Sequence, residues 1–335
     1  MTTWLAIGDV HIRIDNLEDI HRLMERVEEL IQTRKPTFIM LLGDILHTHE
    51  RIHTTCLQYA ERLFTMCSSY CHTYVLIGNH DYISNSQFLT SHHWMTPFKQ
   101  WPNLTIVDKV SEIRHEHQTF IACPYVPDGR MIEALSTVPT WKKARLIFGH
   151  QTLDGVYMGA IKTEHVEEWL PEYPFLCSGH IHDKQRVQPN LYYTGTPMQQ
   201  AFGEKRNKSV AFFTVNEQDI QLEEIELKIS VKRIEYITVQ EAYHYSLTVD
   251  PYETVRLTIK GTREECNTFK KTPSFQKLIK LAKVVFDELQ TTVTKEETTH
   301  SFHEVLYRSV QSNFFMSQLY KRHANLPSFP ELVFE

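Results

Sequence analysis

Five short apolar segments of this chain each run into a glycine that is followed by Asp, Asn or His. The five signatures are GDVH, GDILH, GNHD, GH and GHIH, which begin at Gly8, Gly43, Gly78, Gly149 and Gly179. Glycine permits the tight backbone turn with which the end of a strand projects its next side chain into a pocket. One such signature is typical of an ordinary turn, whereas five at the ends of five apolar segments favour a shared site.

The side chains that these signatures present are rich in oxygen and nitrogen and include no thiolate. Such a set suits Mn²⁺, Fe²⁺ or Zn²⁺, and hydrolytic sites with two metals use one carboxylate to bridge ions about 3.5 to 4 Å apart. His180 and His182 have the spacing of two that, in an extended segment, turns both rings to the same side. The spacing therefore predicts that this pair binds neighbouring ions rather than merely ending a strand.

A layered α/β fold is expected to position these residues, because apolar segments alternate with helical patterns over roughly the first two hundred residues. Strands are expected in TWLAIGD, FIMLLGD, TYVLIGNHD, LTIVDKV, TFIACPYV, ARLIFGH, FLCSGH, LYYTGT and SVAFFTV. A helix is expected over 16–34, opened by Asp15 or Asn16, and another over about 54–70. In an open sheet, ligand sites form at the carboxyl ends of strands, where the signatures lie.

The pattern changes after Glu226. The segment VRLTIKG alternates as a strand does, a helix with a Thr-Pro break follows it, and LIKLAKVVF fits a strand as well as a helix. We therefore expect a large domain over 1–226, a smaller α/β domain over 227–295 and a helical segment over 296–335.

The composition is that of an ordinary soluble protein, with 41% hydrophobic and 23% charged residues among 335. The six cysteines are scattered and predict reduced thiols. The chain has no apolar run of about 18 residues and no secretory signal, so we expect an intracellular, cytoplasmic protein that does not associate with membranes. The net charge of −6 excludes a uniformly basic coat, but 255–285 carries eight basic residues against two acidic ones.

The five signatures, in this order, resemble the calcineurin-like metallophosphoesterase pattern of D-x-H, G-D, G-N-H-D/E, H and G-H-x-H. The resemblance implies a layered α/β/β/α sandwich with a smaller α/β capping domain. It also implies two divalent ions, foremost Mn²⁺, with Mg²⁺, Fe²⁺ or Zn²⁺ as alternatives. The implied ligands are Asp9, His11 and His182 for the first ion, Asn79, His150 and His180 for the second, and Asp44 as the bridge.

The same resemblance gives a role to His80, and two neighbouring residues are expected to assist it. His80 would contact the scissile phosphate, and His47 would help to position His80 or the phosphate. Asp81 would orient His80 from behind, although a carboxylate at this place is equally typical of a turn cap. If His80 is protonated, it can stabilise the charge of the transition state or protonate the departing sugar oxygen.

The stretch SGHIHDKQ followed by YYTGTPMQQAFGEKRNKSVAFF is similar to the corresponding region of SbcD-type DNA repair nucleases, with GTP in place of their usual GSP. In size the chain is similar to the compact bacteriophage members, for which the location would be the host cytoplasm. The similarity implies a DNA exonuclease and endonuclease in recombination and repair. It also implies a homodimer and an SMC-like coiled-coil ATPase partner. The helical stretch 296–323 either docks this partner or closes the chain's own second domain.

DNA also requires basic contacts near the metals, because paired Lys and Arg release counterions from the phosphate backbone. A charge run is more often a solvated helix face, and Trp94, Trp101 and Trp169 are expected in the core rather than as stacking platforms. The candidate DNA contacts are Lys184, Arg186, Lys205, Arg206, Lys208, Lys270 and Lys271.

Two other functions stay open at this point. One is a phosphodiesterase or phosphatase for nucleotides or phosphoproteins, against which the YTGTP and FGE motifs and the basic second domain argue. The other is a scaffold that keeps the fold without catalysis, as some members of the superfamily do. All seven implied ligands and His80 are present, which argues against the scaffold.

Overall fold

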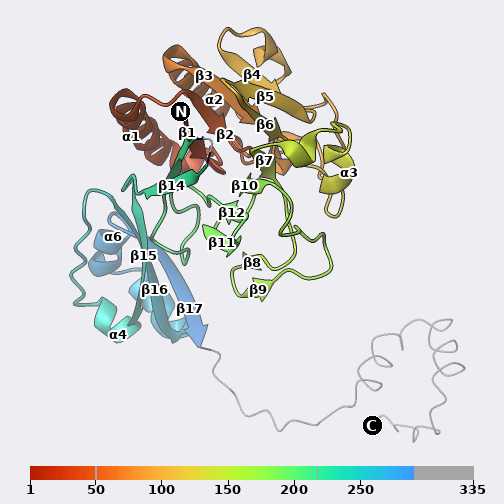
Figure 1. Ribbon diagram of the computed structural model, residues 1–335. Helices are drawn as coiled ribbons and strands as arrows, with labels where there is room; N and C mark the ends of the chain where they lie inside the picture. Colours follow the sequence, from red (N-terminus) through yellow and green to blue (C-terminus); the bar gives the residue numbers. More distant parts are fainter. Residues whose placement is uncertain (50, 217, 290–335) are drawn as a thin grey trace, which may run out of the picture.

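The computed structural model describes residues 1–49, 51–216 and 218–289. Within these residues, a pair of six-stranded sheets stack face to face with helices outside them (Figure 1). The first sheet has the order β14 (Ile220–Ile225), β13 (Val210–Val215), β1 (Thr2–Ile7), β2 (Phe38–Leu41), β3 (His72–Leu76) and β4 (Leu104–Val107). The second has the order β11 (Gln185–Gln188), β12 (Leu191–Tyr193), β10 (Phe175–Gly179), β7 (Leu146–His150), β6 (Gln118–Ala122) and β5 (Ser111–His115).

The core between the two sheets is aromatic. Trp4 is fully buried, with its ring stacked between Phe38 and Phe213 at centroid distances of 5.5 and 4.9 Å. Phe120 and Phe148 of the second sheet meet the same ring edge-on at 5.3 and 5.6 Å. Because side chains alternate along a strand, the next residues of β1 face the other way, towards α1 (Leu17–Arg34) and α2 (Thr54–Tyr70). The expected α/β/β/α layering is therefore confirmed.

Helix α1 buries one apolar stripe, whose members recur every three or four residues: Ile20, Leu23, Met24, Val27 and Ile31. Asn16 is its N-cap residue, as one of the two expected alternatives had it. The Asn16 side chain does not cap the helix but donates to the carbonyl of His11 at 2.9 Å. The start of α1 thus holds the loop that follows β1.

All five glycine signatures lie at the carboxyl ends of parallel strands. In the first sheet these are β1, β2 and β3, and in the second they are β7 and β10. Since the two sheets are stacked, the five ends meet at one edge of the sandwich. The outer side of the second sheet is covered by α3 (Met131–Leu135) and long loops, which carry the small hairpin of β8 (Tyr157–Met158) and β9 (Ile161–Lys162).

A smaller α/β unit follows the sandwich and lies below β14 (Figure 1). Its parallel sheet has the order β15 (Val231–Thr238), β16 (Glu253–Thr262) and β17 (Lys283–Leu289). Three short helices accompany it: α4 (Val239–Ala242), α5 (Arg263–Phe269) and α6 (Pro273–Leu278). The segment LIKLAKVVF, which fitted a strand as well as a helix, contains parts of both. Helix α6 ends at Leu278, and β17 begins at Lys283.

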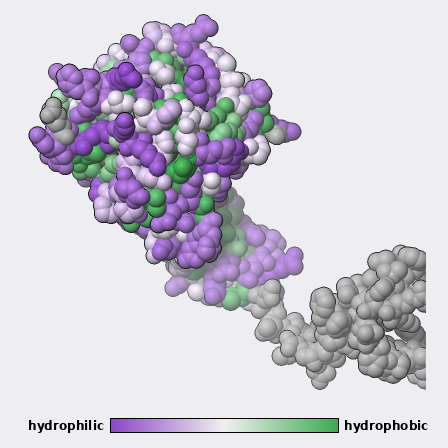
Figure 2. All heavy atoms as spheres, turned by 45° about the vertical axis from the view of Figure 1, so that its right-hand side comes forward, coloured by the Kyte–Doolittle hydropathy of each residue, from purple (hydrophilic) through white to green (hydrophobic). Residues whose placement is uncertain are grey.

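The surface is mixed. The face shown in Figure 2 is mostly hydrophilic, with apolar residues scattered over it in small patches. Trp169 is 2% exposed, and Trp94 and Trp101 pack partly buried against the core, as expected. No helix in the described portion of the chain combines the length and apolar character needed to cross a membrane. The helical segment expected over 296–335, with the candidate docking stretch 296–323, lies outside the described residues.

Candidate metal centre

The seven expected ligands converge where the strand ends of the two sheets meet. The acceptor atoms of Asp9, His11 and His182 lie within 4.8 Å of one another, and so do those of Asp44, His150 and His180. In the first group the Nε2 atoms of His11 and His182 are 3.0 Å apart.

The second group is completed by an amide. Asn79 Oδ1 lies 2.9 Å from His180 Nδ1 and 3.1 Å from His150 Nε2. Asp44 reaches both groups, because its Oδ1 is 3.4 Å from His150 Nε2 and its Oδ2 is 3.5 Å from His11 Nε2. The arrangement is that of two adjoining ligand sets with one carboxylate between them.

The burial and the hydrogen-bond partners of these residues, as well as their types, fit divalent metals. Asp9 is completely buried, and its Oδ2 has no hydrogen-bond partner among the described residues. An unsatisfied buried carboxylate oxygen is costly, so its position calls for a cation. The Nδ1–H of His150 donates to the Leu42 carbonyl at 2.6 Å, so Nε2 is the ring nitrogen that faces the centre.

The backbone at the centre is strained. Asp9, His11, Asp44 and His180 have φ angles of 24°, 47°, 51° and 81°, in the left-handed region that residues other than glycine rarely adopt. Such conformations cluster at functional sites, where the surrounding structure holds them. Gly78 is required for another reason: a Cβ atom there would lie 2.2 Å from Asp44 Oδ1 and 2.4 Å from the Asp44 nitrogen.

Burial and mutual contact separate the pKa values of the acidic and basic groups. Burial raises the pKa of Asp9 to about 6. For Asp44, burial acts in the same direction, but attraction to His150 and its hydrogen bond outweigh burial and lower the pKa. Burial opposes the charge on His150, yet Asp44 and Asp9 raise its pKa to about 9. Burial and the charge on His150 lower the pKa of His180 to about 3. Metal binding should therefore displace a proton from His150.

His80 stands at the solvent side of the centre, with its side chain 26% exposed. Its backbone N–H donates to Asp44 Oδ1 at 2.9 Å, and its Nδ1 donates to the carbonyl of His47 at 2.6 Å. The His47 ring stacks on it at 5.3 Å. The ring of His49 stacks on it at 4.6 Å, a contact that no pattern in the sequence predicted.

Asp81 does not orient His80, which corrects one expected role. Its carboxylate accepts from the backbone N–H of Gly78 at 3.0 Å, from that of Ile45 at 3.2 Å and from the indole of Trp94 at 3.0 Å. Burial and the neighbouring charge of Asp44 raise its pKa to about 7. The turn-cap alternative is the one that these contacts show, because Asp81 joins the loops after β2 and β3.

Glu204 is a further residue of the centre, which lies within the FGE motif but was not among the expected site residues. Its Oε1 lies 3.6 Å from His182 Nδ1, behind the ring nitrogen that faces His11. Its Oε2 accepts from Lys208 and from the Gln200 backbone N–H, both at 2.9 Å. A carboxylate in this position fixes the tautomer and the orientation of a histidine ligand.

The candidate DNA contacts differ in burial, in ion pairing and in their place in the fold. Lys208 is buried and donates to the carbonyl of His182 at 2.9 Å, so it is an internal residue and not a surface contact. Lys184 is paired with Glu224 at 2.7 Å, and Lys205 with Asp183 at 3.1 Å. Arg186 and Arg206 are exposed beside the same segment. Lys270 and Lys271 lie apart from these, at the end of α5 in the small unit.

Residues 2–184 match the calcineurin-like phosphoesterase family. The chain is 38% identical over 273 residues to "Putative phosphoesterase 244L" of Invertebrate iridescent virus 6, which covers 80% of this chain and 96% of that protein. It is 36% identical over 280 residues to "Putative phosphoesterase 078R" of Invertebrate iridescent virus 3, with 82% and 81% covered.

Among solved structures, the Plasmodium protein described as "GAP50 the anchor in the inner membrane complex" is 13% identical, with a TM-score of 0.43 over 68% of this chain and 85% of that one. Similarity at this level carries no argument about substrate. The family match and the viral relatives agree with the metal-facing geometry described above. This chain belongs to the calcineurin-like phosphoesterase family.

Proposed function

We propose that the protein is a DNA nuclease dependent on two metal ions, with exonuclease activity at double-stranded ends and endonuclease activity. The observation that carries the hydrolytic activity is the intact double ligand set around Asp44, with the orphaned Oδ2 of Asp9 inside it. The observation that favours DNA is the segment from His180 to Glu204, which resembles SbcD-type nucleases and here forms one wall of the centre.

In this proposal Asp9, His11 and His182 would hold one ion, Asn79, His150 and His180 would hold the other, and Asp44 would serve both. Bound Mn²⁺ would lower the pKa of a water molecule and offset the charge that develops on the phosphate oxygens. The role of the chain is to fix these donors before substrate arrives, which the strained turns and the partners behind the rings accomplish.

His80 is proposed to donate a proton to the leaving group. The hydrogen bond from His80 Nδ1 to the His47 carbonyl keeps a proton on Nδ1, so Nε2 is the ring nitrogen available to the substrate. A proton held at Nε2 can pass to the departing sugar oxygen, a contribution typically worth about 10²- to 10⁴-fold in rate. The stacked rings of His47 and His49 hold the imidazole in place.

A polymer is favoured as substrate because the centre opens to solvent on one side. The side chains of Asp9 and His150 are 0% exposed, whereas those of His80 and His182 are 26% and 41% exposed. A long phosphodiester backbone can lie across such a centre without entering a closed pocket. In this role the chain is the catalytic subunit of a complex with an SMC-like ATPase.

The test uses the full chain with Mn²⁺, with labelled double-stranded and single-stranded DNA and with bis(p-nitrophenyl) phosphate. Cleavage of DNA that stops with chelator, and falls about 10²- to 10⁴-fold in His80→Ala, supports the nuclease. His92→Ala is the matched control, because His92 is an exposed histidine outside the centre. Cleavage of bis(p-nitrophenyl) phosphate with intact DNA favours the phosphodiesterase or phosphatase alternative. Absence of bound metal and of any hydrolysis favours the scaffold.

A further inference from the structure

The three-stranded sheet of the small unit has one covered face and one open face. Val255, Leu257 and Ile259 of the central strand β16 are buried against the core formed with α4, α5 and α6. The residues between them on β16 point to the other side, where none of them is buried. Within the described residues, no helix covers this side of the sheet.

The strand register arranges the open face in rows. Tyr236 pairs with Thr258, which pairs with Val285, and Tyr236 is 75% exposed. One further row of paired side chains lies on each side of this central row. These rows are Ile234, Arg256 and Lys283 on one side, and Thr238, Lys260 and Asp287 on the other.

The charge of these rows is opposite to that of the whole protein. They contain three basic side chains and one acidic one, on a chain with a net charge of −6. Lys260 and Lys283 are exposed and form no ion pair with any described residue. An exposed aromatic ring between basic groups and threonine hydroxyls is the combination that binds unpaired nucleotides, through base stacking and phosphate contacts.

The open face is connected to the metal centre through one loop. The guanidinium of Arg256 lies 4.3 Å from the centre of the Phe202 ring. Gln199 of the same loop accepts from the backbone N–H of Lys232 at 2.7 Å. Two residues after Phe202 comes Glu204, which lies behind His182. The open face therefore begins beside the wall of the centre.

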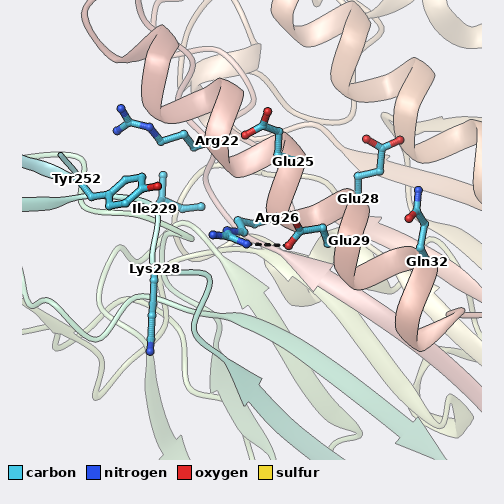
Figure 3. A pocket seen from close by; sticks show the side chains of 9 residues that line it. All are labelled: Arg22, Glu25, Arg26, Glu28, Glu29, Gln32, Lys228, Ile229 and Tyr252. Atoms are coloured by element: carbon cyan, nitrogen blue, oxygen red, sulfur yellow. Dashed lines mark hydrogen bonds and ion pairs between the residues drawn. The ribbon is translucent and has the colours of Figure 1, made fainter.

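Contacts with α1 hold the small unit in this place. Lys232 pairs with Asp19 of α1 at 3.1 Å, and the guanidinium of Arg22 lies 5.2 Å from the centre of the Tyr252 ring. The hollow between α1 and the small unit is seen in Figure 3, with Arg26 and Glu29 paired inside it at 2.8 Å. The residues that line this hollow come from α1 and from the chain at 228, 229 and 252, and they carry charges of both signs, so the hollow is not an anion site.

We infer that the open face of the β15–β17 sheet binds a single DNA strand and leads its backbone to the metal centre. This inference rests on the proposed nuclease function and names the form of DNA that the centre receives. Tyr236 stacks with a base, which is accessible to it only when unpaired, and Lys260, Lys283 and Arg256 contact the phosphates.

In this inference the DNA contacts of the small unit lie on its open face and not on its helices. Lys270 and Lys271 were expected to contact DNA, but the Nζ of Lys270 lies 4.5 Å from the ring of Phe286, which packs with the helices on the covered face. These two lysines thus belong to the opposite side of the sheet. They provide a control of equal charge in the same unit.

The experiment measures fluorescence anisotropy of a labelled strand of about 20 nucleotides with the full chain in chelator, and cleavage with Mn²⁺. Tyr236→Ala should weaken single-strand binding roughly 5- to 150-fold. The double variant Lys260→Ala/Lys283→Ala should lower the slope of log affinity against log salt by about 1.4. Lys270→Ala/Lys271→Ala should bind as the unaltered chain does. Hydrolysis of bis(p-nitrophenyl) phosphate should be unchanged in all of them.

Equal binding by the open-face variants and the unaltered chain overturns the inference, and so does equal weakening in the control. Tighter binding of duplex than of single-stranded DNA overturns it as well. Failure of the nuclease proposal has a different signature, in which the unaltered chain hydrolyses the small diester and leaves DNA intact. In that case the binding arm still decides whether the face binds a single strand.

Discussion

The carboxylate of Glu204 provides a sharp test of how the metal centre is built. Glu204→Gln keeps the size of the side chain and its acceptor oxygen but removes the charge behind His182. Burial opposes that charge, but contacts with His182 and Lys208 outweigh burial and lower the pKa of Glu204 to about 2. The side chain is only 17% exposed, so little solvent screens it.

The expected loss follows from the geometry. Removing the partner of a histidine ligand typically costs 10- to 100-fold in metal affinity or activity, which is about 1.4 to 2.7 kcal/mol. The glutamine retains an acceptor for Lys208 and for the Gln200 backbone N–H, so the fold should be kept. We therefore expect the Mn²⁺ concentration for half-maximal hydrolysis of bis(p-nitrophenyl) phosphate to rise about 10- to 100-fold.

The assay is a Mn²⁺ titration of hydrolysis, with isothermal titration calorimetry as the direct measure of metal affinity. Glu18→Gln serves as control, because Glu18 pairs with Arg22 on the exposed surface of α1. An unchanged Mn²⁺ dependence in Glu204→Gln would refute the reasoning. A loss of activity that appears together with unfolding in chelator would show a role in stability and not in the centre.

Four further outcomes are expected. Gly78→Ala should abolish hydrolysis, because its Cβ would lie 2.2 Å from Asp44 Oδ1; activity near that of the unaltered chain would contradict this. Trp4→Ala should lower the free energy of unfolding in urea by about 3 to 5 kcal/mol, and a loss below about 1 kcal/mol would mean that the ring stack contributes little. Mn²⁺ at about 100 times its Kd should stabilise the fold by about 2.7 kcal/mol, and the increase in Tm should vanish in Asp44→Asn. Burial opposes the charge on Asp108, but hydrogen bonds from Lys99 and His93 lower its pKa below 3.8 in the folded state. Its stabilising contribution is therefore present above about pH 3.8 and lost as the pH falls through the folded pKa. Urea unfolding of Asp108→Asn should therefore differ from that of the unaltered chain at about pH 7, and the difference should shrink as the pH falls below 3.8.

The sequence was sufficient for the features that depend on local pattern. Apolar strands that end in glycine and a polar residue predicted both the layered sheets and the convergence of Asp9, Asp44 and His180, because parallel strands must align their carboxyl ends. Helix α2 begins and ends where its apolar spacing indicated. These predictions needed only the periodicity of side chains and the freedom of glycine.

The predictions that failed depended largely on contacts between separate segments of the chain. Lys208 has the residue type of a surface contact, but Asp183 and Glu204 surround it and draw it inside. Asp81 follows His80 directly, yet its carboxylate turns to backbone N–H groups of another loop. The segment around Lys283 was undecided because pairing with β16 selects a strand, and that pairing is not encoded locally.

The position of the centre across the seam of two sheets also fixes when it can form during synthesis. Asp9 leaves the ribosome early, but its neighbours His180 and His182 follow more than 170 residues later, on the other sheet. Contacts so distant in sequence close late, after the intervening chain has been ordered. A growing chain that lacks β10 has neither complete ligand set, so metal capture and hydrolysis begin only after both sheets have docked.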